Sequence, residues 1–171
     1  MDLSDRLVEH DHWHTTRLLE QAATLSDEAL DRQVRPGLIV HSFEGPEPDV
    51  RTMLDRVIFT KEVWTAAIGG REFAMERDRS IAGQQARLAA VQPQFTALVR
   101  RVRERNEWDD AFVDALCTPP VSFTFGSVIA HILTVSVIRR QTIVEVLREL
   151  GVADVEARDP IEWERMFAAR G

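Results

Sequence analysis

The 171-residue chain has a single cysteine, Cys117, so it forms no disulfide within itself, and it lacks the Cys and His spacings typical of structural zinc sites. Residues 1–14 are acidic and polar, without the basic and apolar regions of a signal peptide, and no uninterrupted apolar run reaches membrane-spanning length. These absences predict a cytoplasmic protein that is neither secreted nor inserted into a membrane. Without a neighbouring cation the Cys117 thiol is a poor nucleophile, which favours a packing role.

Lysine is also scarce: Lys61 stands beside twenty arginines, and the formal net charge is −7. General attraction to a phosphate backbone is therefore not expected. The basic run RRVRER at 100–105 is interpreted as the solvated end of a helix rather than as a nucleic-acid site. Apolar residues make up 44% of the chain, which is enough for a sizeable core at this length. We predict one soluble domain over residues 1–171.

Apolar residues recur at helical spacing in four long stretches, 3–25, 50–68, 80–105 and 125–150. The last stretch is apolar on nearly every face, which is typical of the most buried helix in a bundle. No segment has the period-two alternation of a convincing strand. The sequence predicts an all-α fold, a four-helix bundle in which a site would be built from side chains that project inward.

The connecting segments carry turn signals. Ser26 predicts the cap of a short helical turn, whereas the glycines and prolines of 33–48 predict a long loop, as does the segment 106–123. Pro93 predicts a kink or a break in the third long helix. A proline at 160 begins a short C-terminal helix that reaches Phe167.

Five histidines raise the question of a metal. His10 and His14 lie four residues apart on one helix face, a spacing that lets two imidazoles share an ion, and His131 is the one histidine of the last long helix. The spacing alone is weak, and the alternative is that His10 lies at the edge of the buried stripe while His14 makes a hydrogen bond within the bundle and His12 faces another direction. His41, in the first long loop, is expected to be exposed.

Helical geometry places charged groups on the apolar faces. Asp11 and His14 fall within the apolar stripe of the first helix, and Arg139 falls on the most apolar sector of the last, with Arg140 nearer the margin. A buried arginine needs a carboxylate or an anionic ligand, and Asp11 is the expected partner of Arg139. Arg56 lies toward the edge of its apolar face. A buried ion-pair network and an anion-binding pocket both remain open.

Four segments together resemble the DinB/YfiT-like superfamily of bacterial four-helix-bundle proteins: HDHWHTTRLLEQAATLSDEAL, LDRVIFTKEVWTAAIGG, FTFGSVIAHILTVSVIRRQTIVEVLRELGV and DPIEWE. The resemblance covers about residues 3–164. It implies a bundle that commonly pairs as a homodimer and holds nickel or zinc on three histidines. In some relatives this site supports thiol-dependent transfer with mycothiol or bacillithiol.

The same resemblance implies that this chain has lost the metal site. The family histidine that precedes Glu-x-Trp by six residues corresponds here to Arg56, since that motif lies at 62–64. When His131 is aligned with the first histidine of the last helix, the two ligand positions become Val135 and Arg139. Neither arginine nor valine is a ligand for nickel or zinc.

The sequence therefore supports two functional hypotheses. The first is a metal-free bundle that binds a small anion in the former metal pocket, formed by Asp11, His14, Arg56, His131 and Arg139. The second is a thiol-dependent transferase or a hydrolase that holds a displaced nickel or zinc ion on His10 and His14, with His131 as a further candidate ligand. Binding to nucleic acid or to a membrane is not expected.

Overall fold

The computed structural model describes residues 2–114, 119–155 and 157–168, and Cys117 lies outside this part of the chain. Four long helices dominate it, namely α1 (Leu3–Ala22), α3 (Val50–Ile68), α4 (Ile81–Glu104) and α5 (Phe125–Glu149). The shorter elements are α2 (Asp27–Leu30), the 3-10 helix η1 (Ser42–Glu44), the strands β1 (Ala111–Asp114) and β2 (Val121–Thr124), and α6 (Pro160–Ala168). The fold is mostly helical, as the apolar periodicity predicts.

The long helices begin where short polar side chains can cap them. Asp2, Asp49, Ser80 and Thr124 each accept a hydrogen bond from the backbone N–H three residues on, at the starts of α1, α3, α4 and α5. Ser26 caps α2 in the same way, as predicted. These bonds satisfy N–H groups that the first helical turn leaves without partners.

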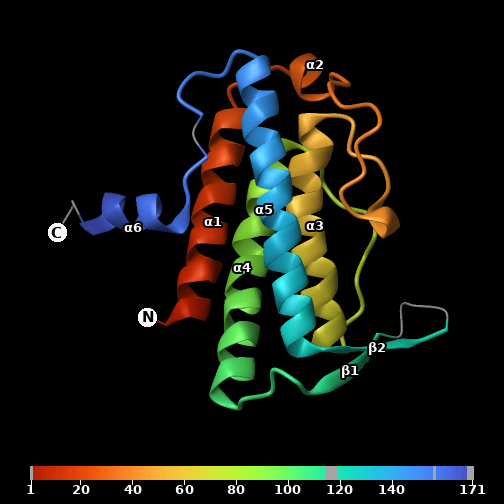
Figure 1. The fold of residues 1–171 in the computed structure, drawn as a ribbon. Helices are drawn as coiled ribbons and strands as arrows, with labels where there is room; N and C mark the ends of the chain where they lie inside the picture. Colours follow the sequence, from red (N-terminus) through yellow and green to blue (C-terminus); the bar gives the residue numbers. More distant parts are fainter. Residues whose placement is uncertain (1, 115–118, 156, 169–171) are drawn as a thin grey trace.

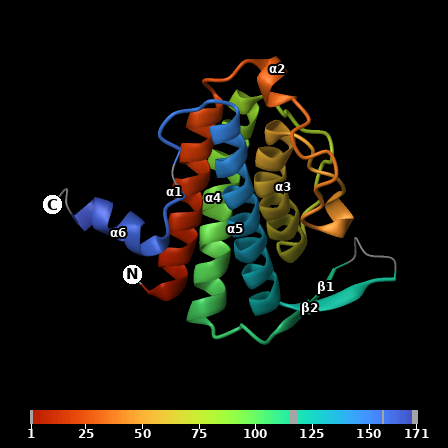
Figure 2. The same cartoon turned by 45° about the horizontal axis from the view of Figure 1, so that its top comes forward.

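The four long helices form a bundle in which α1 packs against α4 and α5, and α3 packs against the same two helices (Figure 1). The segment between α2 and α3 runs along the outer side of α3, and α6 projects from the bundle beside α1 (Figure 2). As a result, α5 has neighbours on two sides, and two different faces of this helix are buried.

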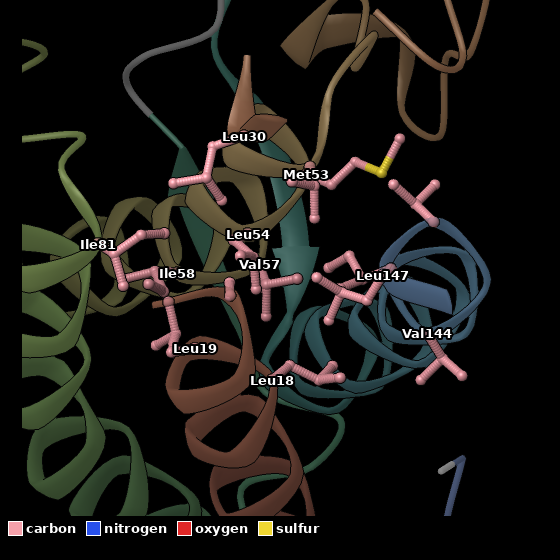
Figure 3. Close-up of a cluster of buried hydrophobic side chains, with 14 of the residues drawn as sticks. Leu18, Leu19, Leu30, Met53, Leu54, Val57, Ile58, Ile81, Val144 and Leu147 are labelled. Carbon is pink, nitrogen blue, oxygen red and sulfur yellow. The ribbon is translucent and has the colours of Figure 1, made fainter. Parts of the chain in front are cut away.

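The apolar core consists of two clusters. One lies toward the α2 end of the bundle and includes Leu18, Leu54, Ile58 and Leu147 (Figure 3). The other lies toward the β1–β2 end and is centred on fully buried residues such as Phe95. Packing of this kind is the main source of stability for helices of this length.

The segment 106–123 contains a β-hairpin that the sequence analysis missed. β1 and β2 pair antiparallel, with Ala111 opposite Thr124 and Asp114 opposite Val121. Each strand has four residues, too few for a period-two pattern to be distinguished from a loop. The hairpin leads directly into α5 and packs against the start of that helix.

The expected kink or break at Pro93 does not end the helix, because α4 is continuous from Ile81 to Glu104. The first helix ends at Ala22, three residues before its predicted boundary at 25. Among the described residues, α5 is the one helix that is long and apolar enough to cross a membrane, although half of its most apolar window is buried within the bundle. A core helix of a soluble protein has the same character.

Candidate functional site

A layer of buried charged side chains lies between the two apolar clusters. On α1 it falls between Val8 and Leu18, and on α5 it falls between Ile132 and Ile143. Its members are Asp11, Lys61, Arg139 and Arg140, all at most 2% exposed, together with Glu47 from the α2–α3 segment, which is fully buried. Charges removed from water must find partners, so their pairing determines what this layer can do.

Asp11 is shared between two cations. Its Oδ2 accepts a hydrogen bond from Nζ of Lys61 on α3, and its Oδ1 accepts one from Nη1 of Arg140 on α5. We call these three residues the buried triad. Burial raises the pKa of Asp11, but the charges and hydrogen bonds of Lys61 and Arg140 lower it by more, to about 2. The carboxylate is therefore ionised at neutral pH, and the triad has one more positive charge than negative.

Arg139 points away from the triad, toward α3 and the α2–α3 segment. Its Nε donates to both carboxylate oxygens of Glu47 at 3.0 Å, and its Nη2 donates to Oε2 of Glu44 and, at 2.7 Å, to Oε1 of Glu47. Its Nη1 donates to Oγ1 of Thr60 at 2.7 Å and to the backbone carbonyl of Arg56 at 3.3 Å. Every nitrogen of this guanidinium is engaged by the protein itself.

We call Arg139 and its side-chain partners Glu44, Glu47 and Thr60 the Arg139 cluster. This cluster leaves little demand for an external anion. Burial raises the pKa of Glu47, although the hydrogen bond and charge of Arg139 oppose that rise. Arg56 lies at the edge of the cluster, half-buried, with its guanidinium carbon 5.3 Å from the centre of the Phe59 ring. Burial lowers the pKa of Arg56, and Glu44 counteracts this effect.

His131 lies beside the Arg139 cluster and faces the α2–α3 segment. Its ring centroid is 4.8 Å from that of His41 and 6.0 Å from that of Trp64. Burial lowers the pKa of His131, and the neighbouring His41 lowers it further. His41 is partly buried in this contact, so the expectation that it is an exposed loop residue was wrong.

A pocket of about 270 Å³ opens on the other side of α5, between α1, α5 and the segment that leads into α6. We call it the α1–α5 pocket. Asp11 and Arg140 of the buried triad form part of its wall. Leu7, Leu133 and Val137 supply apolar surface around them. The pocket thus combines a charged wall with an apolar one, as many small-molecule sites do.

His10 and His14 also line this pocket, and their ring centroids are 5.8 Å apart. Nε2 of His10 lies 2.7 Å from the backbone carbonyl oxygen of Arg158, and because a carbonyl only accepts, this nitrogen carries the proton. Burial lowers the pKa of His10, so its ring is neutral at pH 7. Within the described residues no group of three His, Cys, Asp or Glu side chains is placed to hold a metal ion.

The structure divides the predicted set of site residues into two groups. Asp11 and His14 line the α1–α5 pocket, whereas Arg56, His131 and Arg139 lie on the side of the α2–α3 segment. The predicted burial of Asp11, His14 and Arg139 is confirmed. The predicted pairing of Asp11 with Arg139 was wrong.

Arg140 is the residue that pairs with Asp11, and it is 2% exposed rather than at the margin. Sequence reasoning also missed Lys61, although a signal was present. Lys61 follows Val57 and Ile58 by four and three residues, which places it on the buried face of its helix. A lone lysine at such a position needs a carboxylate partner. Glu44 ends the three-residue helix η1 and Glu47 lies in the loop after it, where no periodicity could have indicated burial.

A comparison with models of known protein families gives no match to this chain, and a comparison with curated proteins gives none either.

Proposed function

We propose that this protein binds a small organic anion, a carboxylate attached to an apolar body, in the α1–α5 pocket. The observation that carries the proposal is the charge of the buried triad. Asp11 neutralises only one of the two cations that contact it, and the second of these, Arg140, lies at the pocket wall. An unbalanced buried charge costs about several kcal/mol, and a bound anion would offset that cost.

The other charged residues of the pocket leave this excess in place. Arg158 and Asp159 both line the pocket and have opposite charges. The Asp159 carboxylate is directed at the start of α6, where it accepts hydrogen bonds from the backbone N–H groups of Ile161 and Glu162 at 2.8 Å. An incoming carboxylate would therefore be attracted to Arg140.

Arg140 has donors to spare for such a ligand. Nη1 is the one nitrogen of its guanidinium that makes a hydrogen bond within the part of the chain that the structure describes, and Nε is buried without a partner. Guanidinium groups bind carboxylates with two parallel N–H donors, which suits a terminal carboxylate. The leucines and Val137 would pack against the apolar part of the ligand.

We further propose that the chain is a cytoplasmic, homodimeric member of the DinB/YfiT-like superfamily with a degenerate metal site. In support, Arg139 donates to the backbone carbonyl of Arg56, so two of the three positions that correspond to family ligands are adjacent. The single cation at position 139 is paired with two carboxylates, Glu44 and Glu47, instead of with a ligand. This arrangement moves the proposed anion site from Arg139 to Arg140.

The test is binding calorimetry at pH 7.5 with hexanoate and with hexanamide, which has the same carbon chain without the charge. We expect saturable binding of hexanoate at one site, at least about tenfold weaker binding of hexanamide, and loss of hexanoate binding in Arg140→Gln. Arg105→Gln is the control, because Arg105 is 68% exposed at the far end of α4. Equal binding of the acid and the amide would exclude the proposal.

Metal analysis of the same preparations tests the second hypothesis, in which a displaced nickel or zinc ion is bound by His10 and His14. Stoichiometric nickel or zinc that disappears in His14→Ala would support a metal-dependent transferase or hydrolase instead of an anion-binding protein.

A further inference from the structure

A second pocket, of about 460 Å³, lies between α1 and α4. We call it the α1–α4 pocket. It includes His12 and Thr16 from α1 and Gln92 and Pro93 from α4, and none of the described residues that line it is Asp, Glu, Lys or Arg. Its chemistry therefore differs from that of the α1–α5 pocket, and an ion has no charged partner on its walls.

Three buried polar atoms on these walls have no hydrogen-bond partner within the described residues: Nδ1 of His12, Oγ1 of Thr16 and Oε1 of Gln92. Gln92 is only 7% exposed. Its Nε2 donates to the backbone carbonyl of Val8 and to Oγ1 of Thr96, both at 3.4 Å. These two bonds orient the amide, and its oxygen accepts no hydrogen bond from the described residues. Buried polar atoms in proteins are nearly always hydrogen-bonded, and these three, gathered on one pocket without a protein partner, are available to a bound molecule.

Pro93 affects one further acceptor, a backbone carbonyl. It lies in the interior of α4 and has no backbone N–H, so the carbonyl of Ala89 lacks the helical hydrogen bond that residue 93 would normally donate. Ala89 also lines the pocket. Gln92 Oε1 and Ala89 O can therefore both accept from a bound molecule, whereas the Thr16 hydroxyl can donate or accept.

We propose that the α1–α4 pocket binds a small uncharged polyol. Hydroxyl groups donate to carbonyl oxygens and also accept from Thr16, and an uncharged molecule fits walls without formal charge. Burial lowers the pKa of His12, and the charge of Lys61 lowers it further, so the imidazole is neutral at pH 7 and Nδ1 can take either role. This site is separate from the proposed anion site and does not depend on it.

The first experiment is a titration of the whole wild-type protein with xylitol, followed by NMR of the Gln92 side-chain amide and the His12 ring. We expect saturable shifts at these groups. 1-Pentanol, which has the same five-carbon chain and one hydroxyl group, should bind at least about tenfold more weakly, because each lost hydrogen bond reduces affinity by about that factor. If xylitol produces no saturable shift, or if pentanol shifts these groups equally, the proposal is overturned.

The second experiment uses variants. Thr16→Val and Gln92→Met should each weaken xylitol binding about tenfold. Gln94→Met is the matched control on the same helix, because Gln94 is exposed and bonds only to the carbonyl of Ala90. Pro93→Ala restores the helical N–H and should raise the melting temperature while weakening xylitol binding. Unchanged xylitol binding in every pocket variant that folds would also overturn the proposal. Two folded variants are enough for this test.

Discussion

Asp11 is the residue at which the buried charges of α1, α3 and α5 meet. Its substitution by Asn keeps the size of the side chain but leaves Lys61 and Arg140 buried without a counter-charge. We expect Asp11→Asn to lower the free energy of unfolding by about 3–5 kcal/mol at pH 7, measured by urea denaturation. Glu20→Gln is the control, because Glu20 pairs with Arg17 at the surface, with both side chains about half-exposed, and should cost about 1 kcal/mol or less.

The same carboxylate makes the effect dependent on pH. The pKa of Asp11 is about 2 in the folded protein and 3.8 in its ordinary state. A depressed pKa contributes stability above the unfolded value and loses it as the pH falls through the folded value. The difference in unfolding free energy between wild type and Asp11→Asn should therefore be constant above pH 5 and shrink below pH 3.8. A difference that stays constant down to pH 2.5 would contradict the assignment.

Helical periodicity predicted which of these residues are buried, but it did not predict their partners. Arg139 and Arg140 are consecutive and differ by about 100° around the helix axis. Since α5 packs against α3 on one side and α1 on the other, both directions lead into the protein. A single-sequence pattern identifies the most apolar direction only, which is why Arg139 was placed correctly and Arg140 was not.

At the scale of elements, Glu47 connects the α2–α3 segment to α5. The segment also has backbone hydrogen bonds from Glu47 N–H to Leu38 O at 2.8 Å and from Arg35 N–H to Pro48 O at 2.9 Å. Glu47→Gln leaves Glu44 as the one carboxylate partner of Arg139 among the described residues. Because this weakens the attachment of the segment to α5, we expect at least about tenfold faster hydrogen exchange at the backbone amides of Arg35 and of residue 47.

Glu149→Gln is the comparison for this prediction. Glu149 also contacts the segment, through Arg35, but its side chain is half-exposed. Its loss should accelerate exchange less than about fivefold, because exposed ion pairs contribute little. Equal acceleration in the two variants would mean that the buried pair does not hold the segment.

The long helices were predictable because each has a cap and an apolar stripe many turns long. The hairpin and the packed α2–α3 segment were not. The strands have four residues each, and the burial of Glu44 and Glu47 depends on Arg139, which is about ninety residues away in the sequence. Contacts of that separation leave no local pattern, so the carboxylate partners of Arg139 could be found only in three dimensions.

At the scale of the whole molecule, the exposed apolar surface of α5 is the candidate interface of the expected homodimer. Val137 and Ile138 are 54% and 50% exposed, two large apolar side chains on the outer face of this helix. We expect light scattering to give about twice the chain mass of 19.5 kDa, and Ile138→Asp to reduce it to the monomer value. Ala90→Asp, on the exposed face of α4, should leave the mass unchanged. A wild-type monomer at millimolar concentration would contradict this prediction.

The excess charge of the buried triad links stability to ligand binding. Arg140→Gln removes that charge and leaves Asp11 paired with Lys61, so the ligand-free variant should melt no lower than the ligand-free wild type. Hexanoate at ten times its dissociation constant should stabilise the wild type by about 1.4 kcal/mol, which is about 3–6 °C for a chain of this size, and should not affect the variant. The measurement is thermal unfolding of both proteins, with and without hexanoate, followed by circular dichroism. If the ligand-free variant melts well below the wild type, Arg140 stabilises the fold in the absence of any ligand. The excess positive charge of the triad would then not be a cost that a bound anion offsets.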